Sequence, residues 1–207
     1  MRCPACQSPV FENDAACRQC GFTLEAADRV FGVPPALHKP LTDPGRVLSM
    51  LARRRLEKCV ARIEHHYPQV EVAVLLLEVP AQAPLGVYAF WLFNRGQLSS
   101  AVEKGGENRL VMLLVDLQTE RAVVMAGYGL EPFLPESQLV MCLNRFSQQA
   151  RRGGLADGID GFLNELDLQF KTVLRQVSRQ FGLAEDDSWQ GLDENPAGEK
   201  AITGSLY

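Results

Sequence analysis

Apolar residues in the middle of the chain form continuous runs of strand length. Two such runs, at 70–79 and 109–117, have the pattern of strands buried on both faces of a sheet. Residues 121–126 follow a polar turn and are expected to pair with the second run as a hairpin. The pattern predicts a short mixed sheet, in which the first two strands are parallel and the third is antiparallel.

The segments between these runs have apolar residues at helical spacing. One helix is expected to begin with Asp43 as its N-cap and Pro44 at its first position, and to stop at Pro68. Three more helices are expected at 84–94, 135–152 and 157–182. Strands alternating with helices predict an α/β fold, a three-layer α/β/α sandwich with helices on both faces of the sheet.

Size and composition fit one ordinary domain with a small appendage. The chain has 207 residues, of which 46% are apolar, so it can bury a substantial core. No apolar run approaches the roughly 18 residues of a membrane span, and the Met-Arg-Cys-Pro start does not resemble a signal peptide. We therefore expect a cytoplasmic protein with no membrane span.

The clearest candidate functional residues lie at the N-terminus, where four cysteines form two Cys-x-x-Cys pairs. This is the ligand set of a tetrahedral zinc site that has no open position for water, so the expected Zn²⁺ is structural. Two disulfides would require an oxidising compartment, which the expected localisation disfavours. The predicted metal ligands are Cys3, Cys6, Cys17 and Cys20.

Composition changes along the chain divide it into four parts. The expected parts are a zinc ribbon at 1–24, a proline-containing linker at 25–42, the α/β domain at 43–183 and an acidic tail at 184–207. The tail has six acidic residues, one lysine and a few apolar anchors such as Trp189, a composition suited to binding a protein partner. Zinc held by four thiolates carries negative charge, which argues against nucleic acid as a partner.

One face of the first helix is basic. Five cations recur along it, which predicts either a solvated face or a surface for phosphate or an acidic partner. They are Arg53, Arg54, Arg55, Lys58 and Arg62.

Four segments, in this order and spacing, resemble the TPM domain family, named for a thylakoid lumen protein, a photosystem repair factor and a nematode receptor modulator. The most specific of them is Gly-Tyr-Gly-Leu-Glu at 127–131. The others are Leu-Thr-Asp-Pro-Gly-Arg-Val-Leu-Ser at 41–49, Tyr-Ala-Phe-Trp-Leu-Phe at 88–93 and Asn-Arg-Leu-Val-Met-Leu-Leu at 108–114. The resemblance covers about 41–168 and implies an α/β/α fold, a divalent cation, often Ca²⁺, and in some members weak acid phosphatase activity.

The resemblance implies a polar site made of Asp43, Asn108 and Glu131. Two departures weaken that site: Glu-Asn-Arg at 107–109 stands where the family has Asn-Asn-Gly, and Gly-Gly-Leu at 153–155 stands where it has Gly-Asp-Tyr. Since Ca²⁺ takes six to eight oxygen ligands, a missing carboxylate matters. The sequence therefore favours a non-catalytic protein-binding or assembly adaptor with no catalytic residues; the alternative is a calcium-type, metal-dependent acid phosphatase.

Overall fold

The computed structural model of the chain describes residues 2–11, 14–99 and 108–180. Two compact units are distinguished, Met1–Phe170 and Lys171–Tyr207, and every contact discussed below lies within the first. The acidic tail expected at 184–207 lies outside the described residues. In the described part, no helix has the length and apolar character needed to cross a bilayer.

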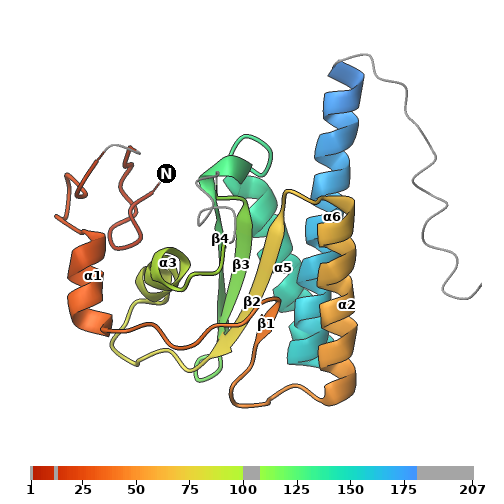
Figure 1. Cartoon of the computed structure of the whole chain (residues 1–207), viewed down its shortest axis with the longest axis horizontal. Helices are drawn as coiled ribbons and strands as arrows, with labels where there is room; N and C mark the ends of the chain where they lie inside the picture. Colours follow the sequence, from red (N-terminus) through yellow and green to blue (C-terminus); the bar gives the residue numbers. More distant parts are fainter. Residues whose placement is uncertain (1, 12–13, 100–107, 181–207) are drawn as a thin grey trace, which may run out of the picture. The chain divides into compact units, whose positions relative to one another are not determined.

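A four-stranded sheet forms the centre of the first unit (Figure 1), in the order β1-β2-β3-β4. The first three strands are parallel, and the last pairs with β3 in the antiparallel sense. The predicted mixed sheet is confirmed, together with an additional two-residue strand, β1, at one edge. The strands are β1 (Leu41–Thr42), β2 (Glu71–Leu77), β3 (Leu110–Asp116) and β4 (Arg121–Ala126).

Side chains of the central strands are buried on both faces of this sheet. Along β2, Val72, Val74 and Leu76 enter one hydrophobic core, whereas Ala73 and Leu75 enter the other. The alternation arises because successive side chains of a strand point to opposite faces. Burial on both faces explains why the strand reads as a continuous apolar run.

Helices cover the two faces and complete the predicted α/β/α layers (Figure 1). The first core includes residues from three helices, and the second is closed by two others. The former are α2 (Met50–His66), α5 (Glu136–Gly153) and α6 (Leu155–Gln180); the latter are α1 (Leu24–Phe31) and α3 (Leu85–Arg95).

Helix α1 lies within the segment that the sequence analysis treats as a linker. Thr23 caps its N-terminus, since its hydroxyl accepts a hydrogen bond from the Ala26 amide at 3.1 Å. Gly32 ends the helix with a φ of 76°, a conformation that glycine adopts without strain. The helical pattern was missed because eight residues give little more than two turns of periodicity.

Helix α1 is held against α3 by both apolar and polar contacts. The Trp91 indole donates a hydrogen bond to Asp28 at 2.9 Å, and the Arg95 guanidinium pairs with the same carboxylate at 2.6 Å. Hydrogen bonds from Arg95, and then from Trp91, hold the pKa of Asp28 below its ordinary value. Ala27 is buried beneath these contacts, and the Phe31 ring packs edge-on against Tyr88. The segment before β1 is therefore docked on the α/β domain along α1.

The expected start of α2 at Asp43 and Pro44 is wrong. Ser49 is the N-cap, and its side chain accepts a hydrogen bond from the Ala52 amide at 3.2 Å. The Asp43 carboxylate instead accepts hydrogen bonds from the Val47 and Leu48 amides in the loop that precedes the helix. Aspartate is common both at helix N-caps and in turns, because in each position its side chain accepts hydrogen bonds from nearby backbone amides.

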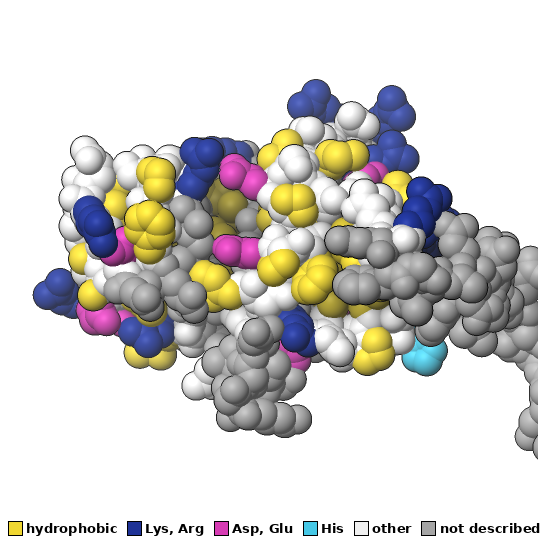
Figure 2. All heavy atoms as spheres, turned by 90° about the horizontal axis from the view of Figure 1, so that it is seen from above, with side chains coloured by type: hydrophobic (Ala, Val, Ile, Leu, Met, Phe, Trp, Pro, Cys, Tyr) yellow, Lys and Arg dark blue, Asp and Glu magenta, His cyan; other side chains and the backbone are white. Residues whose placement is uncertain are grey.

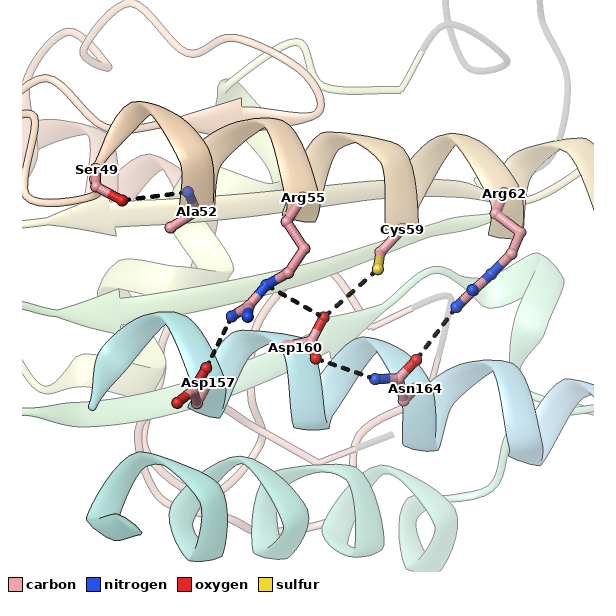
Figure 3. Close-up of polar contacts among 8 residues, drawn as sticks. All are labelled: Ser49, Ala52, Arg55, Cys59, Arg62, Asp157, Asp160 and Asn164. Carbon is pink, nitrogen blue, oxygen red and sulfur yellow. Dashed lines mark hydrogen bonds and ion pairs between the residues drawn. The ribbon is translucent and has the colours of Figure 1, made fainter. Parts of the chain in front are cut away.

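Two cations of the predicted basic face join α2 to α6 (Figure 3). Arg55 pairs with Asp157 at 2.8 Å, and Arg62 donates a hydrogen bond to Asn164 at 3.2 Å. Between them, the half-buried Cys59 thiol donates to Asp160 at 3.5 Å; burial, followed by that carboxylate, raises the pKa of the thiol. This part of the basic face therefore contacts a neighbouring helix and is not an open anion-binding surface.

Candidate functional site

The four N-terminal cysteines come together as predicted. Their sulfur atoms all lie within 4.8 Å of one another, with Cys3 and Cys20 separated by 3.7 Å and Cys6 and Cys17 by 3.6 Å. A tetrahedron with Zn–S bonds of about 2.3 Å has sulfur atoms about 3.8 Å apart, so the spacing fits such an ion. All four cysteines are free thiols. The cluster can hold one metal ion.

The two Cys-x-x-Cys turns have the same backbone hydrogen bonds. In the first, the Gln7 amide donates to the Cys3 carbonyl at 2.9 Å; in the second, the Gly21 amide donates to the Cys17 carbonyl at 2.8 Å. Gln7 and Gly21 occupy equivalent positions, with φ of 62° and 70°. Each cysteine that opens a turn also donates its own amide to the residue five positions later, Ser8 or Phe22. This repeated geometry aims both pairs of thiols at one point.

Local hydrogen bonding makes one thiol of this cluster readily ionised. The Ser8 side chain and backbone lower the pKa of the Cys6 thiol to about 6, so its thiolate is available at neutral pH, whereas burial, followed by the Cys6 thiol, raises the pKa of the Cys20 thiol. Thiolates are the form of cysteine that binds metal. A cation is therefore the natural partner of the cluster.

The polar residues implied by the resemblance do not meet at one site. Strand β1 pairs Thr42 with Leu75, so Asp43 lies beside the carboxyl end of β2. Asn108 precedes Leu110, which pairs with Glu71 at the amino end of β2. About seven residues of strand separate the two levels, or about 20 Å at roughly 3.3 Å per residue. A single cation cannot bind both side chains.

Asp43 is already committed to local contacts. Its side chain is inaccessible to solvent and accepts hydrogen bonds from the Val47 amide at 2.9 Å and the Leu48 amide at 3.2 Å. Arg53, the first cation of the basic face, lies 3.3 Å from the same carboxylate. These contacts fix the loop before α2.

Asn108 and the Gly-Tyr-Gly segment do lie together, at the end of the sheet opposite to Asp43. The Gly129 amide donates to the Asn108 carbonyl at 2.9 Å, and the Asn108 side chain accepts from the Leu110 amide at 3.0 Å. A Cβ atom on Gly127 would collide with both oxygens of Asn108, and one on Gly129 would lie 2.6 Å from a side-chain carbon of Arg109. The glycines are needed for close approach, and Glu131 is exposed just beyond them.

The missing acidic residue of the Gly-Gly-Leu turn is not replaced by a free carboxylate. Gly154 ends α5 with a φ of 87°, and a Cβ atom on Gly153 would collide with the Asp157 carboxylate. Asp157 itself pairs with Arg55, and Asp160 accepts from the Cys59 thiol (Figure 3). Both acids therefore serve the contact between α2 and α6.

Comparison with known proteins identifies the α/β part of the chain. The family model of the TPM domain matches residues 41–169. The chain belongs to the TPM domain family. The match begins at β1, so the cysteine cluster lies outside it. A search among curated proteins gives no match.

Two solved structures share this fold. The N-terminal domain of a protein from P. gingivalis, solved by NMR, has a TM-score of 0.50 and 25% identity, covering 65% of this chain and 83% of that one. The BA42 protein of the psychrophilic bacterium Bizionia argentinensis, also an NMR structure, has a TM-score of 0.51 and 12% identity, covering 63% of this chain and 86% of that one. Both neighbours support the α/β/α architecture of the TPM domain.

A groove of about 730 Å³ lies where the first cysteine turn approaches the TPM domain. Its walls come from that turn, from α3, from β4 and from the start of α5, together with the short 3₁₀ turn η1 (Tyr128–Leu130). Figure 2 shows a hollow with an apolar lining and acidic side chains at its rim. The sequence does not predict this groove because its walls come from five different elements, and only the position of β4 at the sheet edge could have indicated it.

Proposed function

We propose that this protein is a non-catalytic binding or assembly adaptor whose N-terminal ribbon is stabilised by structural zinc. The observation that carries the proposal is the separation of Asp43 from Asn108 and Glu131 across the sheet. Zinc is favoured among metals because four cysteine thiolates in tetrahedral spacing are its characteristic structural site. A four-thiolate shell has no open position, so the ion serves folding and not catalysis.

Phosphoryl transfer depends on cationic groups placed around the transferred phosphate. A divalent metal could provide that charge only if its oxygen ligands converged. Asp43 is turned into its own loop, and the Asn108 side chain caps the Leu110 amide. Both side chains are therefore engaged in local hydrogen bonds. These contacts support a binding role over the calcium-type acid phosphatase, which remains the alternative.

A protein partner and a cytoplasmic setting complete the proposal. Free thiols suit a reducing compartment. The acidic, partly apolar composition of 184–207 supports a linear segment that binds a partner protein.

Hydrolysis of a generic aryl phosphate tests this proposal directly. We expect no turnover above a buffer blank with Ca²⁺, Mg²⁺ or Mn²⁺, because the oxygen ligands do not converge. Glu131→Gln and Asp43→Asn variants serve as matched controls, and both should give the same background rate as the unaltered chain. Metal-dependent turnover that Glu131→Gln abolishes would overturn the adaptor and establish the phosphatase.

A further inference from the structure

We infer that the outer edge of β4 is a docking site for an extended, basic segment of a partner protein, which adds to the sheet as a fifth strand. The inference rests on the proposed binding function and gives it a location and a partner chemistry. Strand β4 is the last in the sheet order, and its residues 122–126 are only half-buried. An exposed edge strand offers hydrogen-bonding groups to any chain that can lie beside it.

The hydrogen-bond pattern shows which groups of β4 face outward. The Gly127 amide donates to the Leu110 carbonyl at 2.9 Å, so this pair belongs to the bonded set. Bonded and non-bonded pairs alternate along an antiparallel ladder. The amides and carbonyls of Ala122, Val124 and Ala126 therefore point away from β3. No hydrogen bond joins these outward groups to any residue that the structure describes.

Both walls beside this edge are apolar. Phe90 and Phe93 of α3 line the groove from one face of the sheet, and Leu139 and Leu143 of α5 line it from the other. All four side chains are half-buried. Since successive side chains of a strand point to opposite faces, a fifth strand would place one against α3 and the next against α5. The partner segment must therefore be apolar on both faces.

Charge at the end of β4 favours a basic partner. The described residues lining the groove include two acids, Glu131 and Glu136, and one cation, Arg2, which lies 3.5 Å from Glu136. A lysine or arginine beyond the residue that pairs with Ala126 would approach the excess negative charge. The chain's own segment 184–207, with six acids and one lysine, has the wrong sign for this rim.

Amide hydrogen exchange with a defined peptide tests the inference. The peptide is Lys-Val-Leu-Thr-Val-Leu-Lys, added to the full zinc-loaded chain labelled with ¹⁵N. We expect exchange at the Ala122, Val124 and Ala126 amides to slow by at least about tenfold. The Val123 and Met125 amides already bond to β3 and should not change. Protection of all five amides alike, or of none, would overturn the inference.

Modified peptides separate strand addition from simple apolar contact. Two versions of the peptide carry N-methyl groups on alternate residues. One version blocks the odd-numbered amides, and the other blocks the even-numbered amides. If the peptide adds to β4 as a fifth strand, one methylated version binds normally and the other binds at least about tenfold more weakly, because only alternate amides of the peptide face β4. Equal binding of both versions contradicts strand addition. A version with glutamate in place of both lysines should also bind at least about tenfold more weakly.

Protein variants complete the test. Val124→Pro removes an outward amide that the β3 ladder does not use, and proline is tolerated on edge strands; we expect a loss in affinity of at least about tenfold. Glu131→Lys leaves the strand unchanged and should weaken binding of the basic peptide while improving binding of the glutamate version. Unchanged binding in both variants contradicts the site.

Other occupants have distinct signatures. If the three amides are protected without peptide, and this protection rises with protein concentration, a second copy of the chain pairs with β4. That result would overturn the assignment of this edge to a partner protein. Protection lost on truncation after residue 183 would assign the edge to the chain's own tail, with the same consequence. Phosphatase turnover would defeat the proposed function while leaving the exchange pattern intact, so the two failures can be distinguished.

Discussion

Removing the metal should unfold the two cysteine turns and leave the TPM domain folded. Structural zinc sites contribute apparent binding free energies of about 10–16 kcal/mol, and these turns have little else to hold them. The described residues before Phe22 have no core of their own beyond Cys3 and Cys17. Helix α1 should stay docked, because Ala27 is buried and Asp28 bonds to Trp91 and Arg95. The loss of structure should therefore stop at the start of α1.

Elemental analysis and limited proteolysis check this result. The purified chain should contain about one zinc per molecule, and a chelator should expose sites before residue 22 to protease while residues 24–99 and 108–170 stay protected. Cys17→Ser should reproduce the effect without a chelator. Cys59→Ser is the matched control, since this cysteine lies outside the cluster, and it should retain the metal. Iron in place of zinc, or protection of the turns after metal loss, would count against the account.

Replacing Asp43 with alanine should destabilise the domain by about 2–4 kcal/mol. The change leaves the Val47 and Leu48 amides without their acceptor and removes a solvent-inaccessible partner of Arg53. Glu57→Ala is the matched control, since Glu57 is the other carboxylate near Arg53, at 3.6 Å, and is substantially exposed. An exposed pair of this kind contributes about 0.5 kcal/mol.

Urea denaturation in calcium-free buffer measures both variants. If Asp43 has a structural role, Asp43→Ala shows the whole expected destabilisation without added calcium. A ligand role predicts that Asp43→Ala matches the unaltered chain in this buffer and differs from it only when calcium is present, which would refute the structural assignment.

Periodicity in the sequence was sufficient to predict most of the fold. The buried strands β2 and β3 and the helices α5 and α6 are long enough for apolar spacing to distinguish them. Strand β1 has two residues and helix α1 has eight, so neither yields a periodic signal. The signals for α1 were its caps, Thr23 and Gly32, which local chemistry explains without any periodicity.

The cysteine cluster was also predictable, because its ligands are close in sequence and their spacing reflects the metal. The polar residues of the TPM domain are far apart in sequence, and their relative positions depend on strand direction. Glu131 follows the carboxyl end of β4, which is antiparallel and therefore ends beside the amino end of β3. Asp43 follows β1, which is parallel to β2, and so lies at the opposite edge. Residue types alone do not show at which end of the strands each side chain lies. The predicted hairpin does show it for Glu131, because a hairpin makes β4 antiparallel to β3.

A calcium titration followed by NMR tests whether these polar residues lie at two opposite ends of the strands and share no cation site. The backbone signals of Asp43, Asn108 and Glu131 are followed in the zinc-loaded, ¹⁵N-labelled chain up to about 1 mM Ca²⁺, the upper range of weak protein sites. We expect small, non-saturating shifts near exposed acids such as Glu131 and none at Asp43. A single saturable transition that shifts Asp43 and Glu131 together would contradict this expectation.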